Sequence, residues 1–105
     1  MKVKNNLDIS TSGPKKLILK LYVSGMSQRS MAAIENINRF CHQHFEGSCE
    51  LEIIDLYKNP KIASEQQIIF SPSLFKISPL PQKILVGNFS NTEKVLSGLG
   101  IIPNE

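Results

Sequence analysis

The stretch Ile69–Gly87, IFSPSLFKISPLPQKILVG, decides the fold, because three prolines interrupt a run that is otherwise mostly apolar. Pro72, Pro79 and Pro81 each remove a backbone hydrogen-bond donor, and each moves the preceding residue away from the helical conformation. The stretch is therefore too apolar for an ordinary surface loop and too interrupted for a single helix or strand. We interpret it as a buried turn with a specific role, or as a segment with two alternative packings.

The residues before this stretch follow a strand–helix–strand pattern. Leu17–Val23 is nearly continuous in apolar and β-forming residues, which is typical of a strand buried on both faces. From Ser27, a candidate N-cap, apolar residues recur at spacings of three and four and predict a helix that stops near Gly47. Cys49–Tyr57 returns to strand character, and the short connections predict a right-handed βαβ unit with parallel strands. The predicted apolar stripe of the helix consists of Met31, Ile34, Ile37, Cys41 and Phe45.

The second half of the chain allows two interpretations of each segment. Prolines, glycines and apolar residues alternate there too closely for a local pattern to decide between helix and strand. The first pair of alternatives is a helix from Pro60 to Gln67 or a strand at Gln67–Phe70. The segment Gln82–Val86 is either a strand or a helical turn. The last pair is a helix at Thr92–Leu99, capped by Ser90 or Asn91, or a strand at Leu96–Ile102.

Length and composition predict one soluble domain. A chain of 105 residues can bury a single core, and its 41% apolar and 20% charged residues are ordinary for a globular protein. We expect residues 1–15 to be a flexible leader, 16–102 the domain and 103–105 a short tail. The formal net charge of +3 is not gathered into an Arg-rich stripe, which argues against nucleic-acid binding. No apolar run is long enough to cross a bilayer, and we expect a cytoplasmic protein.

Residues that suggest chemistry are few. Thiol oxidoreductases with a βαβ start carry Cys-x-x-Cys at the beginning of the first helix, but here Ser27 and Ser30 occupy those positions. Cys41 and Cys49 are eight residues apart without a metal-binding pattern, and we expect two free thiols rather than a disulfide. Asp55, at the end of a predicted strand, is expected to organise a turn. We expect no enzymatic activity, no metal, no cofactor and no bound ATP, because the sequence contains neither a metal-ligand motif nor a phosphate-binding loop.

Several blocks of residues, spread over about residues 16–100, together form a recognisable pattern. They are Leu19–Val23 and Gly25, Phe45 and Gly47, Ile54–Leu56 and Lys58–Pro60, Ser71–Leu74, Lys76, Ile77, Pro79 and Pro81, and finally Gly87, Phe89, Ser90, Glu93–Leu96, Gly98 and Leu99. This pattern resembles the KaiB family, whose members are small partners of the hexameric KaiC ATPase in the cyanobacterial circadian oscillator.

The resemblance implies an α/β fold of the thioredoxin-like kind with two possible arrangements of the second half. One is a tetrameric ground state with the element order βαββααβ, and the other is a monomeric state with the order βαβαββα, which binds the ATPase. The implied function is that of a non-enzymatic regulator, a dimer or tetramer when free, that binds a KaiC-type ATPase and modulates its phosphorylation and ATPase cycle. The alternative function is a thioredoxin-like adaptor in stress-response signalling without a clock role.

The resemblance also assigns roles to individual residues. The implied contacts with an acidic patch of the partner are Lys58, Lys76 and Lys83. The implied turn and fold-switch residues are Pro72, which stands where thioredoxin-like folds hold a cis-proline, Pro79, Pro81 and Gly98.

The chain departs from the family pattern on the surface that faces the partner. Leu80 replaces the middle residue of a proline run, and Glu52 and Ile84 stand where clock members tend to carry basic residues. The chain also ends without the acidic extension common in clock members. The missing acidic extension and Glu52 favour the adaptor role, and the sequence does not decide whether a third, KaiA-like component is recruited.

Overall fold

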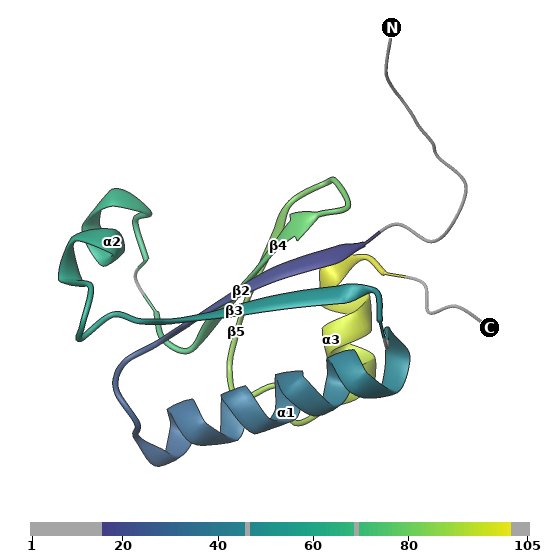
Figure 1. The fold of residues 1–105 in the computed structure, drawn as a ribbon, viewed down its shortest axis with the longest axis horizontal. Helices are drawn as coiled ribbons and strands as arrows, with labels where there is room; N and C mark the ends of the chain where they lie inside the picture. Colours follow the sequence, from purple (N-terminus) through teal and green to yellow (C-terminus); the bar gives the residue numbers. More distant parts are fainter. Residues whose placement is uncertain (1–15, 46, 69, 102–105) are drawn as a thin grey trace, which may run out of the picture.

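The computed structural model describes residues 16–101, with the exception of residues 46 and 69. Its elements follow one another in the order βαβαββα, so the chain adopts the second of the two expected arrangements (Figure 1). Their bounds are β2 Leu17–Val23, α1 Gln28–His44, β3 Cys49–Asp55, α2 Pro60–Glu65, β4 Ser73–Ser78, β5 Lys83–Val86 and α3 Thr92–Leu99. The predicted leader and tail lie outside the described residues. None of the helices described is both long enough and apolar enough to cross a membrane.

Strand β2 lies inside a four-stranded sheet with the order β3-β2-β4-β5. It pairs with β3 in parallel, from Leu17 opposite Cys49 to Val23 opposite Asp55, which confirms the predicted βαβ unit. Strand β4 runs antiparallel to β2 and to β5, which leaves β3 and β5 as the edges of the sheet. The β2–α1 connection and the turn after β3 therefore leave the sheet at the same end.

The hydrophobic core lies between one face of the sheet and the helices α1 and α3, which are on the same side of the sheet (Figure 1). Every second residue of β2, from Leu17 to Val23, is at most 1% exposed. On the opposite face of β2 the ring of Tyr22 is also buried, and it meets the ring of Phe75 edge-on with the centroids 4.9 Å apart. The prediction of burial on both faces is therefore confirmed only in part, because Ile18 and Lys20 on the face of Tyr22 are partly exposed. The buried apolar residues of the two helices are Ala33, Ile37, Phe40, Val95 and Leu99.

Helix α1 begins where the sequence predicts, but its buried face differs from the predicted stripe. Ser27 is the N-cap, and its Oγ accepts a hydrogen bond from the backbone N–H of Ser30 at 3.2 Å. The prediction that Met31 faces the core is wrong, because Met31 is 56% exposed while the neighbouring Ser30 is buried. Ile37 does face the core, so the error is one of helical phase in the first turn. The buried residues of α1 are Ser30, Ala33, Ile37 and Phe40.

Tertiary pairing decides the alternatives between Pro60 and Val86. Helix α2 begins with Pro60 in its first turn, where the missing N–H costs no helical hydrogen bond. The strand considered at Gln67–Phe70 is not formed by its described residues, and the positive φ of 54° at Gln67 is incompatible with extended backbone. Lys83–Val86 is a strand, because it finds a partner in β4.

The C-terminal segment is a helix rather than a strand. The side chain of Asn91 caps α3 by accepting a hydrogen bond from the backbone N–H of Lys94 at 3.1 Å. Val95 and Leu99, four residues apart, are both buried on the same face of the helix. The interpretation of Leu96–Ile102 as a strand is therefore wrong for its described residues; its last residue lies outside them.

All three prolines of the deciding stretch follow cis peptide bonds, namely Ser71–Pro72, Ser78–Pro79 and Leu80–Pro81. The first of these bonds precedes β4, at the position expected from the resemblance. The other two lie in the connection between β4 and β5. The stretch is consequently a turn, a strand and a second turn, followed by the edge strand.

Cys41 and Cys49 are joined by a disulfide, so the expectation of two free thiols is wrong. The connection between α1 and β3 turns back so tightly that the two Cα atoms are 5.9 Å apart. This distance lies within the range of about 4.4–6.8 Å that a disulfide requires. The spacing of the cysteines in the sequence does not reveal this, because the approach depends on the turn between the two elements.

Helix α3 lies directly against β5 at Gly98. A Cβ atom at Gly98 would lie 2.5 Å from Cδ2 and 3.1 Å from Cδ1 of Leu85. Unbonded carbon atoms pack at about 3.5–4.0 Å, so the absence of a side chain is what allows this approach. The role of Gly98 in a fold switch stays a prediction.

Replacing Gly98 by Val should lower the free energy of unfolding by about 1–3 kcal/mol, because the new side chain pushes Leu85 away from α3. The matched control is Ser97→Val, which puts the same residue at an exposed position of the same helix and should change stability by less than about 0.5 kcal/mol. Urea unfolding followed by circular dichroism measures both variants. Equal stability of the two variants would contradict the close approach.

Candidate functional site

The start of α1 carries two hydroxyls where thiol enzymes of this topology carry two thiols. The Ser27 hydroxyl donates a hydrogen bond to Oγ of Ser30 at 3.1 Å, and Ser30 is only 1% exposed. Two hydroxyls cannot exchange disulfides, so the pair closes the first turn of the helix instead of serving as a redox centre. Among the residues that the structure describes, no group of His, Cys, Asp and Glu is arranged to hold a metal ion.

Asp55 joins the loop before α1 to the turn after β3. Its Oδ1 accepts hydrogen bonds from the backbone N–H of Gly25 and of Tyr57, both at 2.9 Å. Its backbone carbonyl accepts from the backbone N–H groups of Lys58 and Asn59, both at 3.1 Å. The prediction that Asp55 organises a turn is confirmed, and one carboxylate holds two loops together. We call this arrangement the Asp55 junction.

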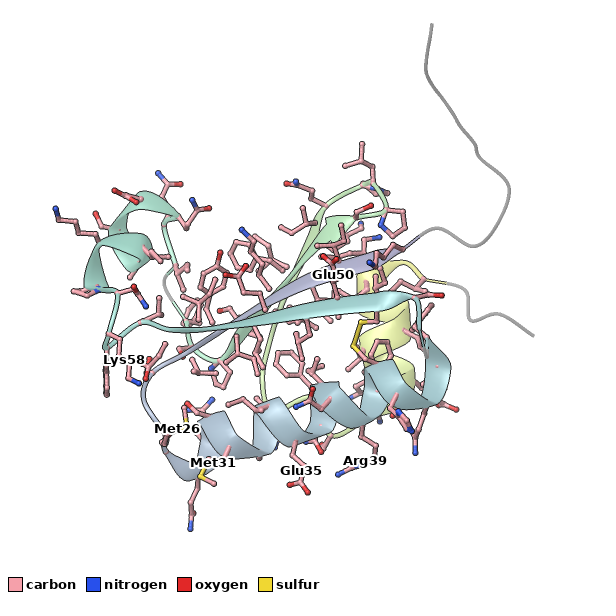
Figure 2. The ribbon with its side chains drawn as sticks, viewed as in Figure 1. Met26, Met31, Glu35, Arg39, Glu50 and Lys58 are labelled. Atoms are coloured by element: carbon pink, nitrogen blue, oxygen red, sulfur yellow. A yellow bond between two sulfur atoms is a disulfide. The ribbon has the colours of Figure 1, made fainter. Side chains whose placement is uncertain are left out.

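Three exposed apolar side chains lie at the junction, and we call Met26, Met31 and Tyr57 the α1-start patch. They are 61%, 56% and 76% exposed, respectively. The ring of Tyr57 lies on Gly25, because a Cβ atom there would come within 2.8 Å of Cδ2 of the ring. Met26 precedes the N-cap and Met31 is the fourth helical residue, the two positions that form a hydrophobic staple. Figure 2 shows both methionines at the start of α1, with Lys58 at the neighbouring turn.

The segments that carry the patch contain three basic residues and are flanked by carboxylates. Segments 24–34 and 56–64 contain Arg29, Lys58 and Lys61, and Glu35, Asp55 and Glu65 lie immediately outside them. All three basic residues are exposed. An apolar centre with the exposed Lys58 beside it suits a partner surface that is apolar and carries an acidic group.

The structure does not bring the three predicted partner contacts together. Lys58 is exposed in the turn after β3, beside the α1-start patch (Figure 2). Lys76 and Lys83 lie opposite each other on β4 and β5, and Lys76 also pairs with Leu19 of β2. Lys83 is exposed, but Lys76 is only 1% exposed, and burial together with the nearby charge of Lys83 lowers the pKa of Lys76. In this conformation Lys76 offers a partner almost no surface.

The element order and the serine pair define the class: a protein of the thioredoxin-like fold without Cys-x-x-Cys at the start of its first helix. The N-terminal domain of SasA from Synechococcus elongatus superposes with a TM-score of 0.68 at 17% sequence identity, covering 92% of this chain and 94% of that one. Chloroplastic thioredoxin z gives a TM-score of 0.68 at 13% identity, covering 82% and 77%. At such low identities the likeness shows the fold alone.

Sequence comparison narrows this class to a family. The KaiB domain family matches residues 20–101 of the chain. Circadian clock protein KaiB3 of Synechocystis is 43% identical over 88 residues, which are 84% of this chain and 86% of that protein. Circadian clock oscillator protein KaiB of Cyanothece is 41% identical over 91 residues, which are 87% of each. The chain belongs to the KaiB family of circadian clock proteins, which confirms the resemblance found in the sequence.

Sequence reasoning missed the α1-start patch. The predicted stripe places Met31 in the core, and the helical pattern gives no role to Met26 or Tyr57. A signal was nevertheless present, because Met26 and Met31 stand on either side of the capping Ser27 at the spacing of a hydrophobic staple. Tyr57 was hidden because it extends an apolar strand pattern by two residues beyond the observed end of β3.

Replacing Asp55 by Ala should lower the free energy of unfolding by about 1–3 kcal/mol, because the backbone N–H groups of Gly25 and Tyr57 lose their acceptor. Asp55→Asn retains a carbonyl oxygen at the same position and should lose less than half as much. Urea titrations of the three proteins make the comparison. Two variants that are both as stable as the wild type would show that the Asp55 junction contributes nothing.

The lowered pKa of Lys76 should appear in the pH dependence of stability. In the unfolded chain Lys76 has the ordinary lysine pKa of 10.5, and in the folded chain its pKa is lower. At any pH between these two pKa values, the unfolded chain therefore holds the Lys76 proton more strongly than the folded chain does. The destabilisation is therefore fully present below this window and is relieved as the pH rises through it. Wild type should gain stability relative to Lys76→Met between pH 7 and about pH 10.5, and Lys83→Met should reduce that gain. Parallel stability curves for wild type and Lys76→Met would contradict the assignment.

Proposed function

We propose that this chain is a non-enzymatic regulatory protein that binds a KaiC-type hexameric ATPase and modulates its phosphorylation and ATPase cycle. Membership of the KaiB family supports the proposal, because the KaiB clock proteins are regulatory. The observation that carries it is the α1-start patch, which stands where thiol enzymes of this fold have their reactive cysteines. With serines there, this end of the molecule serves to dock a partner.

The patch has the chemistry of an interface centre. Tyr and Met are enriched at the centres of protein–protein interfaces, and the unbranched thioether side chains of Met26 and Met31 adapt to the shape of a partner. The Asp55 junction holds the backbone on either side of Tyr57 before binding. Less conformational entropy is then lost when the partner docks, which favours affinity.

Among the three proposed lysine contacts, we assign direct contact to Lys58 and Lys83, both of which are exposed. Charges at the rim of an interface act mainly on the association rate and on its salt dependence. Lys76 is buried on β4, between β2 and β5, and does not touch the partner in this conformation. Its proposed role is to help position the β4–β5 segment.

We also propose that the free protein self-associates as a dimer or tetramer and that its second half is the part that rearranges. Edge strand β5 exposes Ile84 and Val86, which are 61% and 56% exposed, and a second copy would cover them. The residues proposed to shape the rearrangement are Pro72, Pro79, Pro81 and Gly98.

A second candidate function, an adaptor in stress-response signalling, is favoured by Glu52. This residue is exposed on edge strand β3, where the family pattern tends to have a basic residue. The adaptor would dock a protein other than a KaiC-type ring.

Light scattering on a sizing column, with a purified KaiC-type hexamer and ATP, tests the proposal. We expect the wild-type chain to elute with the ring, and the double variant Met26→Ser/Met31→Ser to raise Kd at least about tenfold because the apolar anchors are lost. The matched control Phe70→Ser removes an apolar side chain that is 66% exposed in the connection between α2 and β4 and should change Kd by less than about twofold. Lys58→Glu should weaken binding more at low salt than at high salt.

The outcomes separate the parts of the proposal. Failure of the wild-type chain to join the ring would overturn the KaiC-type partner and favour the adaptor. Binding that is equally tight for wild type and the methionine variant would leave the partner in place and overturn the α1-start patch as its docking surface.

A further inference from the structure

The disulfide lies at the opposite end of α1 from the patch. Cys41 is in the last turn of α1, and Cys49 is the first residue of β3. Figure 2 shows the sulfur–sulfur bond linking the helix to this strand. Both side chains are partly buried and pack against the hydrophobic core.

Backbone hydrogen bonds bring the two cysteines together independently of the bond. The N–H of Phe45 donates to the carbonyl of Cys41 at 2.9 Å, and the N–H of Ser48 donates to the carbonyl of Phe45 at 2.8 Å. The N–H of Leu17 then donates to the carbonyl of Ser48 at 2.7 Å, which anchors the turn to β2. The two sulfur atoms therefore stay neighbours when the bond is reduced, and the bond can form again.

A surface hollow gives small molecules access to the pair. Its lining includes Cys41, Phe45, Gly47 and Cys49, and its volume is about 230 Å³. The space beside Gly47 is open, because a Cβ atom there would meet nothing within 4 Å apart from its chain neighbours. Cysteines sealed in the core would lack such access and would be inert toward thiols in solution.

We propose that Cys41 and Cys49 form a reversible redox site that responds to low-molecular-weight thiols and disulfides and sets the stability of edge strand β3. In oxidation, the two cysteine thiols pass two electrons and two protons to a small disulfide such as oxidised glutathione. One S–S bond forms, another breaks, and two small thiols are released. Reduction by a small dithiol runs the same exchange in reverse. The proposal does not depend on the proposed function.

The bond acts on β3 because this strand is shallowly packed: none of its residues is fully buried, although Leu51 contacts the core. Within the described part of the chain β3 pairs with β2 on one side, and Ile53 within it is 40% exposed. The disulfide fixes the first residue of β3 to α1 and shortens the loop that the unfolded chain can sample, which favours the folded state. In a reducing compartment such bonds are transient and respond to the redox state.

Thermal unfolding of the full chain in oxidised glutathione and in dithiothreitol tests the site. We expect reduction to lower Tm by roughly 10 °C. We also expect faster amide hydrogen exchange in β3 and the last turn of α1, with a smaller change in β4. The double variant Cys41→Ser/Cys49→Ser is the control and should unfold at the same temperature under both conditions, close to reduced wild type.

Alkylation of free thiols, followed by mass measurement of the folded wild-type protein, decides the outcome without any variant. We expect both cysteines to be protected in oxidised glutathione and both to be alkylated after incubation with dithiothreitol under native conditions. Two thiols that stay free in oxidised glutathione would overturn the proposal, and so would a bond that dithiothreitol cannot reach until the protein unfolds. A bond that forms reversibly while Tm and exchange in β3 stay unchanged would overturn the stabilising role.

Discussion

The pairing of β2 with a strand on each of its sides is the constraint on which the rest of the structure depends. Its parallel register with β3 puts Val23 opposite Asp55, so the chain leaves the sheet from both strands at the same edge. This register brings the Asp55 carboxylate within 2.9 Å of the backbone N–H of Gly25, thirty residues earlier. The α1-start patch depends on that contact in turn, because the loop and the turn that carry its side chains meet there.

The first half of the fold could be predicted because its patterns are local. Leu17–Val23 is apolar enough to require burial on both faces, and Ser27 marks the helix start by its capping chemistry. The phase of the helix could not be predicted in its first turn. Ser30 is polar and Met31 apolar, yet Ser30 is buried with its hydroxyl bonded to that of Ser27, while Met31 is 56% exposed. A rule based on hydrophobicity alone therefore chooses the wrong residue.

The second half could not be predicted because its elements are set by contacts with distant residues. Lys83–Val86 is short enough to be a strand or a helical turn, and its pairing with β4 decides. Gly98 suits either a strand or a helix that packs closely on a neighbour, and its close approach to Leu85 of β5 is what selects the helix. The burial of Lys76 follows from its place on the same face of β4 as Leu74, and so depends on which strands this segment pairs with. The choice between two arrangements is thus a choice between sets of long-range contacts, which local propensity does not contain.

The cysteines of this chain lie at the opposite end of α1 from those of thiol enzymes with the same fold. At the N-terminal end, where the helix macrodipole would stabilise a thiolate, the chain has serines and the α1-start patch. Its cysteines lie at the other end, where that stabilisation is absent, and Cys41 bonds to the protein's own edge strand. Strand β3 begins at Cys49 and ends at Asp55, so the bond fixes the first residue of the strand whose last residue holds the patch. Strand β3 is thus the structural link between the cysteine pair and the α1-start patch, because the strand that the bond fixes at its start carries the Asp55 junction at its end.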